Sequence, residues 1–318
     1  MRQRVLVTGG AGFIGSHVAD AYLQRGARVW IADDLSTGKR PNVPAGAEFV
    51  HIDIRDQRLR DVFADAKGFD IVSHHAAQID VRVSVANPRH DAAINVDGFL
   101  NVVECAVAAG CGRFIFVSSG GVIYGEPEQL PTPEQLPKRP LSPYGVTKLV
   151  GEHYLHYYAN VRGLEYAALR YSNVFGPRQD PHGEAGVVAI FSTRIGRGEP
   201  LTIFGDGEQT RDYVFVADVV NANLLVGEAQ LPPSDTLDAR GFNVGTGAAT
   251  SVNELARTLM RAAGREVGVN YAPARPGELQ HSCLDATRLR GLGWAPTGSL
   301  QDNLGTTYRY INQQEARV

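Results

Sequence analysis

The amino-acid sequence predicts an α/β fold, with a Rossmann-type doubly wound parallel sheet and a smaller C-terminal α/β lobe. Short apolar stretches alternate with longer amphipathic ones from residue 4 to residue 176. This alternation is typical of βαβ units, in which helices connect parallel strands. The apolar stretches are nearly continuous, which indicates strands covered by helices on both faces of the sheet.

The expected elements follow one another along the chain. We expect strands at residues 4–9, 28–34, 47–56, 69–77 and 113–119, with helices at residues 13–26, 57–66 and 91–110. Six prolines from Pro127 to Pro143 indicate a loop. A helix is expected at residues 143–162, because Ser142 is a good cap and Pro143 suits the first turn. A buried strand is expected at residues 165–176.

The composition changes after residue 176, which suggests a domain boundary. Residues 1–176 are expected to form the Rossmann domain, with residues 208–240 returning to it. Residues 177–207 and 241–318 are expected to form the smaller lobe, because glycine, proline and charged residues cluster there between short elements.

Composition and charge exclude several classes of function. The chain has 318 residues and a formal net charge of −3, so we expect neither nucleic acid nor an anionic membrane as a partner. Its three cysteines form no CxxC pair, so no disulfide framework or metal site is expected. Without a signal-peptide core or a long apolar run, the expected location is cytoplasmic.

A glycine-rich turn follows the first predicted strand. Gly9, Gly12 and Gly15 occur at three-residue intervals and lead into the first predicted helix. Glycines there let the backbone approach a pyrophosphate, and the helix N–H groups attract its charge. A plain tight turn would have the same spacing, but Asp33 at the end of the second strand favours a nucleotide site. An acidic group at that position binds the ribose hydroxyls of NAD and repels the 2′-phosphate of NADP.

Two further acidic residues follow predicted strands. Asp34 lies beside Asp33 and precedes the basic residues Lys39 and Arg40, which favours NAD over NADP. Asp53 can either reach the adenine or cap the next helix, and both alternatives stay open.

Tyr144 and Lys148 form a candidate proton-transfer pair. They are four residues apart on a predicted helix, so their side chains share one face. A lysine ammonium stabilises a phenolate, and the helix N-terminus adds a favourable field. Such a tyrosine can accept a proton from a sugar hydroxyl while a hydride leaves the same carbon. The alternative is a surface tyrosine beside a solvated lysine.

These motifs together resemble the extended short-chain dehydrogenase/reductase superfamily, in its NAD-dependent epimerase/dehydratase branch. The likeness rests on the glycine motif, Asp33, "HHAAQ", Asn95, "VSSGGVIYG" and "SPYGVTK". Further along, "RYSNVFGPRQDPHGEAGVVAIF", "LTIFGDGEQTRDYVFVADVV", "FNVGTG" and "ARPGELQHSCLD" are similar to nucleotide-sugar enzymes, above all to the UDP-glucose 4-epimerases. The resemblance covers essentially the whole chain and makes the smaller lobe a nucleotide-sugar-binding lobe.

The resemblance implies a reaction and a set of site residues. In this family NAD stays bound, accepts a hydride from C4 of the hexose of a UDP-sugar and returns it to the other face. Tyr144 matches the acid/base residue, and Lys148 matches the lysine that tunes it. The implied cofactor site comprises Gly9, Gly12, Phe13, Ile14, Asp33, Asp34, Leu35, Ser36, Thr37, Gly38, Asp53, Ile54, His75, Ala76, Ala77, Gln78, Asn95, Ser118, Tyr144, Lys148, Tyr171, Asn173 and Val174. The implied substrate site comprises Val81, Ser84, Ser119, Gly120, Tyr144, Asn173, Val187, Val188, Thr202, Phe204, Gln209, Arg211, Arg275, Glu278 and Ser282.

Two departures from the family pattern lie before Tyr124. Dehydratases of the branch have an Asp-Glu pair where this chain has Gly121, Val122 and Ile123, so we reject dehydration and disfavour decarboxylation. The serine or threonine that usually assists the tyrosine falls on Gly120. Either Ser119 replaces it, or a water molecule does, or Tyr144 acts alone.

Several alternatives follow from the same resemblance. Ser282 matches a gate residue beside the hexose, and its small volume predicts that N-acetyl sugars are also converted. A UDP-glucuronate 4-epimerase is the second candidate, with Arg82, Ser84 and Thr202 as possible contacts to its carboxylate. A non-catalytic NAD-binding regulator is a remote third. The resemblance also implies a homodimer through helices at residues 91–110 and 143–162, although their apolar faces could equally cover the sheet.

Overall fold

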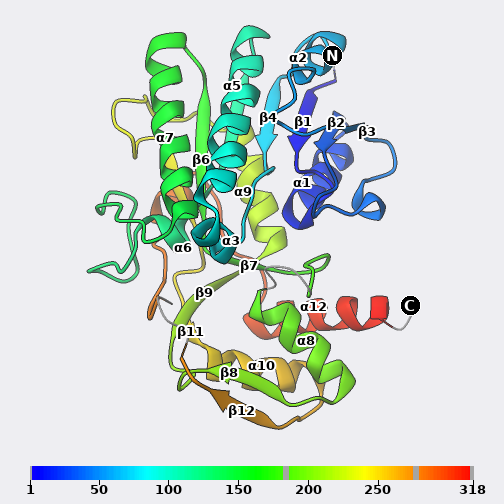
Figure 1. Cartoon of the computed structure of the whole chain (residues 1–318), viewed down its shortest axis with the longest axis vertical. Coiled ribbons are helices and arrows are strands. Elements are labelled where there is room, and N and C mark those ends of the chain that lie inside the picture. The colour runs from blue at the N-terminus through cyan, green and yellow to red at the C-terminus, as the bar shows by residue number, and fades with distance from the viewer. Residues whose placement is uncertain (1, 182–185, 275–278, 316–318) are drawn as a thin grey trace.

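The computed structural model describes residues 2–181, 186–274 and 279–315 (Figure 1). Its large sheet has seven parallel strands in the order β10-β6-β5-β4-β1-β2-β3. These strands are β1 (Arg4–Thr8), β2 (Arg28–Asp33), β3 (Glu48–His51), β4 (Ile71–His74), β5 (Arg113–Ser119), β6 (Tyr166–Tyr171) and β10 (Gly241–Val244). The strand order reverses between β1 and β4, which confirms the Rossmann-type sheet and leaves a crevice at that point.

Helices cover both faces of the large sheet (Figure 1). One face packs against α1 (Phe13–Gln24) and α9 (Val216–Glu228), and the other packs against α2 (Leu59–Asp65), α5 (Phe99–Ala108) and α7 (Pro143–Arg162). Shorter turns of helix complete this part: η1 (Arg40–Asn42), α3 (Val81–Ala86), α4 (Pro88–Ala92), η2 (Ala93–Gly98) and α6 (Gly120–Ile123). The two faces therefore have separate cores, as the continuous apolar strands predict.

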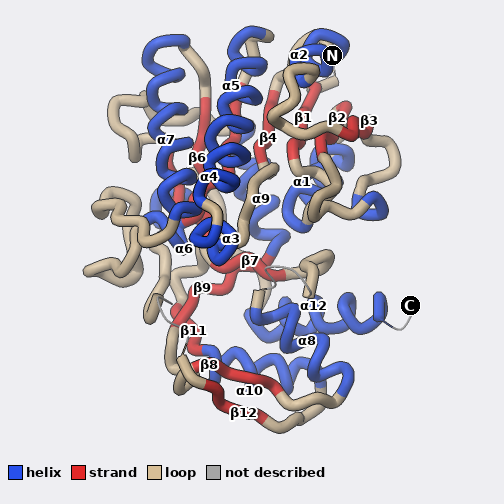
Figure 2. The backbone as a smooth tube through the Cα atoms, in the orientation of Figure 1, coloured by secondary structure: helices blue, strands red, loops and turns tan. Residues whose placement is uncertain are grey.

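A smaller lobe lies beyond the carboxyl ends of these strands (Figure 2). It contains a three-stranded sheet of β7 (Asn173–Phe175), β9 (Thr210–Phe215) and β11 (Ala249–Ser251), and a pair of β8 (Leu201–Phe204) with β12 (Val269–Ala272). Three helices, α8 (Val187–Arg197), α10 (Val252–Ala263) and α12 (Leu300–Glu315), pack around Phe191, Leu259 and Leu304. The short helix α11 (Thr287–Gly291) joins the core of the large sheet through Leu289.

The structure differs from the expected elements and domain bounds at several places. Residues 210–215 were expected to return to the Rossmann domain, but they form β9 of the smaller lobe, because β9 pairs with β7 and β11. The expected strand at residues 165–176 divides at Ser172, because β7 leaves the large sheet and pairs with β9. The expected helix at residues 91–110 is divided into the end of α4, the π-helical segment η2 and α5. Residues 241–244 were expected in the smaller lobe, but β10 pairs with β6 because Phe242 is buried in the core of the large sheet. No helix of the described ranges has the length and apolar character needed to cross a bilayer.

Candidate active site

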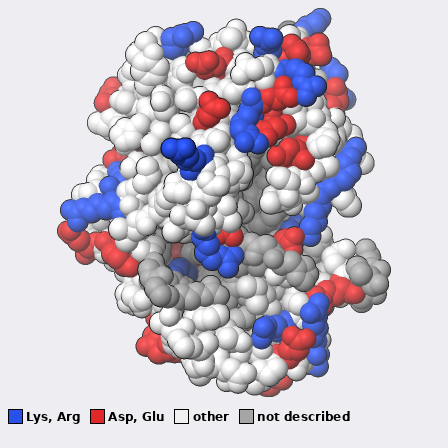
Figure 3. Space-filling view, viewed as in Figure 1, with Lys and Arg blue, Asp and Glu red and all other residues white. Residues whose placement is uncertain are grey.

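Most of the predicted cofactor residues follow strands of the large sheet, where these strands end. The turn after β1, the loops after β2 and β4, and the end of β5 all lie at the edge that faces the smaller lobe (Figure 1). The molecular surface is hollowed between these two parts (Figure 3). Ligands of doubly wound folds bind at this edge, outside the carboxyl ends of the strands.

The glycine turn after β1 is too crowded for side chains. Gly9 has a φ of +66°, and a Cβ atom there would lie 2.6 Å from the backbone nitrogen of Ala76. A Cβ atom at Gly15 would overlap the carbonyl of Gly9. Gly12 precedes α1 and has no side chain with which to cap it. The first N–H groups of α1 are thus left for a bound anion, which fits a pyrophosphate.

Two carboxylates organise the loop after β2. Asp33 is buried and accepts hydrogen bonds from the backbone N–H groups of Ala11, at 2.9 Å, and Leu35, at 2.8 Å. Burial raises the pKa of Asp33 despite these bonds. Asp34 accepts bonds from the backbone and hydroxyl of Ser36, at 2.9 and 2.7 Å. A Cβ atom at Gly38 would lie 2.6 Å from Asp33, so the loop closes tightly around an acidic centre that suits ribose hydroxyls and repels phosphate.

The two interpretations of Asp53 can be separated. Its carboxylate accepts bonds from the backbone N–H of Arg55, at 2.8 Å, and from the Arg55 guanidinium. This guanidinium lowers the pKa of Asp53. The helix cap is wrong, because α2 begins at Leu59 and is preceded by Arg58. The neighbouring Ile54 packs in the core, against Gly98, rather than toward the crevice.

The loop after β4 brings further predicted cofactor residues to the crevice. His75 shares a 2.8 Å hydrogen bond with Ser73, and its buried Nδ1 has no partner within the described part of the chain. Burial lowers the pKa of His75 to about 3, so the ring is neutral. The side-chain amide of Asn95 accepts a hydrogen bond from the backbone N–H of Gln78 and donates one to its carbonyl, both at 2.9 Å. A crowded glycine turn, an acidic loop and an unsatisfied ring nitrogen together fit a dinucleotide.

Helix α7 presents Tyr144 and Lys148 from its first two turns. The helix begins as the sequence predicts, with the Ser142 hydroxyl accepting from the N–H of Gly145 at 3.1 Å. The Lys148 ammonium lies 5.7 Å from the centre of the Tyr144 ring and donates to the carbonyl of Val117 at 2.9 Å. Lys148 is buried, and burial lowers its pKa to about 8. The surface alternative is therefore wrong for the lysine, whose charge lies where it can act on the phenol.

The end of β5 explains the missing hydroxyl at residue 120. A Cβ atom at Gly120 would lie 2.5 Å from a methyl group of Leu284 and 3.2 Å from the carbonyl of Arg170, so any side chain there would require Leu284 to move. Ser118 is buried, and its hydroxyl donates to Glu152 at 2.5 Å instead of facing the crevice as a cofactor ligand. Ser119 is only partly buried, so its hydroxyl is the remaining candidate at the end of β5 to assist Tyr144.

The residues implied for the substrate are divided between the two parts of the chain. In the smaller lobe, the side-chain amide of Gln209 donates to the carbonyl of Phe204 at 2.9 Å. The backbone N–H of Ser282 donates to the carbonyl of Thr210 at 3.1 Å. These contacts bring Phe204, Gln209, Arg211 and Ser282 into one region, whereas Val187 and Val188 begin α8 and Thr202 lies on β8. Arg275 and Glu278 lie outside the described residues.

Two implied site residues have side chains that are directed into the core. Ser84 is fully buried, and its hydroxyl donates to the carbonyl of Val81 within α3 at 2.7 Å. Tyr171 is also buried and accepts from the Asn223 amide at 2.6 Å. Neither side chain can contact a ligand without rearrangement, because both are enclosed by the protein.

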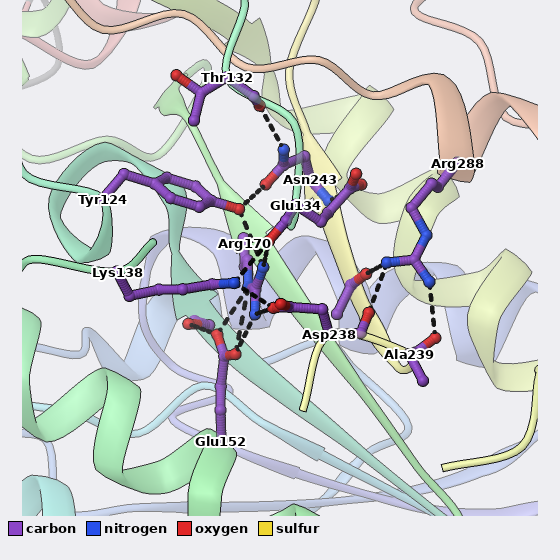
Figure 4. Close-up of polar contacts among 12 residues, drawn as sticks. Tyr124, Thr132, Glu134, Lys138, Glu152, Arg170, Asp238, Ala239, Asn243 and Arg288 are labelled. Carbon is purple, nitrogen blue, oxygen red and sulfur yellow. Dashed lines mark hydrogen bonds and ion pairs between the residues drawn. The ribbon is translucent and has the colours of Figure 1, made fainter. Parts of the chain in front are cut away.

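A buried ionic cluster behind β5 was not predicted from the sequence (Figure 4). Arg170 of β6 is fully buried and binds Glu152 of α7 at 2.6 Å and Asp238 at 2.7 Å. It also donates to the Tyr124 hydroxyl at 3.0 Å. Because Glu152 holds Ser118, the cluster fixes the end of β5. An arginine inside an otherwise apolar strand was the available signal, since a buried charge requires partners.

Comparisons with known proteins identify relatives of this chain in both sequence and fold. The model of the NAD dependent epimerase/dehydratase family matches residues 5–245. UDP-glucose 4-epimerase of Mycolicibacterium smegmatis is 43% identical over 317 residues, which cover 98% of this chain and 99% of that protein. The crystal structure of Thermotoga maritima UDP-glucose 4-epimerase with UDP-glucose has 45% identity and a TM-score of 0.93, covering 98% and 99% of the two chains. That of the Thermus thermophilus enzyme with NAD has 43% identity and a TM-score of 0.90, covering 97% and 98%.

Proposed function

The chain belongs to the NAD-dependent epimerase/dehydratase family, and on this premise we propose that it interconverts UDP-glucose and UDP-galactose at C4. The chain is an NAD-dependent nucleotide-sugar epimerase, because relatives with 43–45% identity over nearly its whole length have this activity. The observation that carries the assignment of roles is the pair of Tyr144 and the buried Lys148 at the start of α7, beside the end of β5.

The proposed mechanism is a reversible oxidation at C4 of the hexose. When bound, NAD supplies the hydride acceptor. Tyr144 removes the proton of the C4 hydroxyl and returns it after the sugar has turned over. Lys148 stabilises the phenolate, because its buried ammonium lies 5.7 Å from the centre of the Tyr144 ring. We assign to the Ser119 hydroxyl the hydrogen bond to the C4 oxygen of the substrate. Leu284 occupies the space that a side chain at residue 120 would need, and the Ser118 hydroxyl is bound to Glu152.

The test is epimerisation by the purified protein without added NAD. UDP-galactose, UDP-N-acetylgalactosamine and UDP-galacturonate are supplied separately, and the products are followed. We expect conversion of UDP-galactose and its loss in Tyr144→Phe, which keeps the ring but removes the hydroxyl. Conversion of UDP-galacturonate alone would establish the glucuronate epimerase instead, and an unaffected Tyr144→Phe variant would overturn the assigned role.

We propose that the N-acetyl sugars are also substrates. Ser282 is adjacent to the residues of the smaller lobe that the resemblance assigns to the nucleotide sugar, and its side chain is small. Replacement by tyrosine should reduce kcat/KM for UDP-N-acetylgalactosamine at least tenfold while sparing UDP-galactose, because the larger side chain would take the space of the N-acetyl group. A tenfold loss corresponds to about 1.4 kcal/mol. Equal losses on both sugars would contradict a gating role for residue 282.

We propose a homodimer formed through α7 and its neighbour α5. Tyr154, Tyr157 and Val161 of α7 are exposed, at 37%, 49% and 60%, whereas Leu155 and Tyr158 face the sheet. Helix α7 therefore has one apolar face for the core and a second one that is uncovered. Tyr157→Glu should halve the mass measured by light scattering.

We also propose a cytoplasmic location, where the three free cysteines would stay reduced.

A further inference from the structure

A buried carboxylate lies behind the candidate catalytic pair. Asp91 belongs to the short helix α4, and no part of it is exposed. Neither the predicted cofactor contacts nor the predicted substrate contacts include it. A charged group is costly to bury, so a buried carboxylate needs donors, a cation or a function.

The partners of Asp91 all donate hydrogen bonds. One oxygen accepts from the Thr147 hydroxyl at 2.8 Å, and the other accepts from the side-chain amides of Gln78 at 2.9 Å and Asn95 at 3.0 Å. This is the pattern that an ionised carboxylate requires. The three donors come from three different segments, so the carboxylate joins the loop after β4, the π-helical segment and α7.

Thr147 places this carboxylate beside the first turns of α7, from which Tyr144 and Lys148 extend. It immediately precedes Lys148 on α7, and its hydroxyl contacts both Asp91 and the carbonyl of Tyr144, at 2.8 and 3.1 Å. Burial lowers the pKa of Lys148, and the negative charge of Asp91 opposes this decrease. A carboxylate near a buried ammonium favours the charged form of the lysine.

We propose that Asp91 is a positioning residue that keeps the buried Lys148 positively charged, so that Lys148 can stabilise the Tyr144 phenolate. The inference rests on the proposed function for its catalytic consequence. The effect on the charge of Lys148 is inferred from the burial of both groups and from the contact of Asp91 with Thr147, the residue that precedes Lys148. Asp91 therefore acts on the proton acceptor through Lys148 and touches neither substrate nor cofactor.

Among the residues that the structure describes, the other ionisable groups near Lys148 do not supply this charge. His74 and His75 of β4 are neutral, because burial and the charge of Lys148 lower the pKa of each. Glu152, one turn further along α7, is bound to Arg170. Asp80 and Arg82, where α3 begins, pair with each other at 3.0 Å. Asp91 is the buried carboxylate whose charge acts on the lysine.

Asp91→Asn tests the proposal, because it keeps the shape and removes the charge. In the wild type and the variant, the absorbance of phenolate at 295 nm is titrated and compared with the same protein carrying Tyr144→Phe, which isolates Tyr144. We expect the midpoint of the Tyr144 signal to move upward by about one pH unit. The acid limb of kcat/KM for UDP-galactose should move with it, which lowers activity at pH 7 about tenfold.

Thr147→Val is the matched control, because it removes one hydrogen bond to Asp91 while the amides of Gln78 and Asn95 still hold the charged carboxylate in place. It should leave both midpoints in place. A uniform loss of activity at every pH in Asp91→Asn, with an unmoved 295 nm midpoint, would overturn the proposal and leave Asp91 a structural role. If Asp91→Asn does not fold, Asp91→Ser removes the same charge and leaves space for water. A shifted 295 nm midpoint in a protein without epimerase activity would refute the proposed function and retain the inference.

Discussion

Adding the hydroxyl that the family pattern expects at residue 120 should damage this protein. A Cβ atom at Gly120 would lie 2.5 and 3.0 Å from the two methyl groups of Leu284. Carbon atoms in contact prefer about 3.5–4.0 Å, so Leu284 would have to move by about 1 Å. Leu284 is buried beside Ile123 and Tyr124, and it has little room to do so. Overpacking of this kind costs about 1–3 kcal/mol, and we expect Gly120→Ser to lower the free energy of unfolding by that amount.

Gly121→Ser is the matched control. A Cβ atom at Gly121 would meet only the Ser119 hydroxyl, at 3.9 Å, which is an ordinary contact. Urea denaturation of both variants measures the difference in unfolding free energy, and kcat is measured on UDP-galactose. Leu284→Ala should restore part of the stability lost in Gly120→Ser, with a coupling of about 1–3 kcal/mol between the two sites. If Gly120→Ser were as stable as Gly121→Ser and more active than the wild type, the steric argument would be refuted.

Three further predictions concern neighbouring residues. Ser119→Ala should lower kcat by about 100-fold, close to the effect of Tyr144→Phe, and a loss below threefold would instead assign the role to water or to Tyr144 alone. Lys148→Met should abolish epimerisation yet raise the free energy of unfolding at pH 7 by up to about 3 kcal/mol, because folding lowers the pKa of this buried lysine to about 8. The folded state then binds fewer protons between about pH 8 and pH 10.5, so the wild type gains stability as the pH rises through that range, and the variant should lack this gain in urea denaturation. Arg170→Met should cost about 3–5 kcal/mol in the same measurement, since it leaves Glu152 buried without its cation, and a cost below 1 kcal/mol would contradict that reasoning.

Local patterns in the sequence were sufficient for the class of fold and for the candidate pair. Alternating apolar and amphipathic stretches predicted the parallel sheet, and the cap at Ser142 placed Tyr144 and Lys148 on the first turns of α7. Both depend on neighbours within a few residues of each other, so no tertiary contact was needed to predict them. The glycine spacing likewise predicted a tight turn, and the structure places Gly9 in it with a positive φ.

Contacts between distant segments were decided by the tertiary structure alone. Leu284 lies far from Gly120 in the chain yet occupies the space of its side chain, so the absent hydroxyl has a steric cause that no local pattern contains. Ser118 is taken from the crevice by Glu152, which Arg170 holds in turn. Asp91, which our proposal makes responsible for the charge of Lys148, is likewise distant from the lysine in the chain. Spacing along the chain determines which side chains share one element, whereas packing determines which of them keep a proton, a charge or room for a ligand.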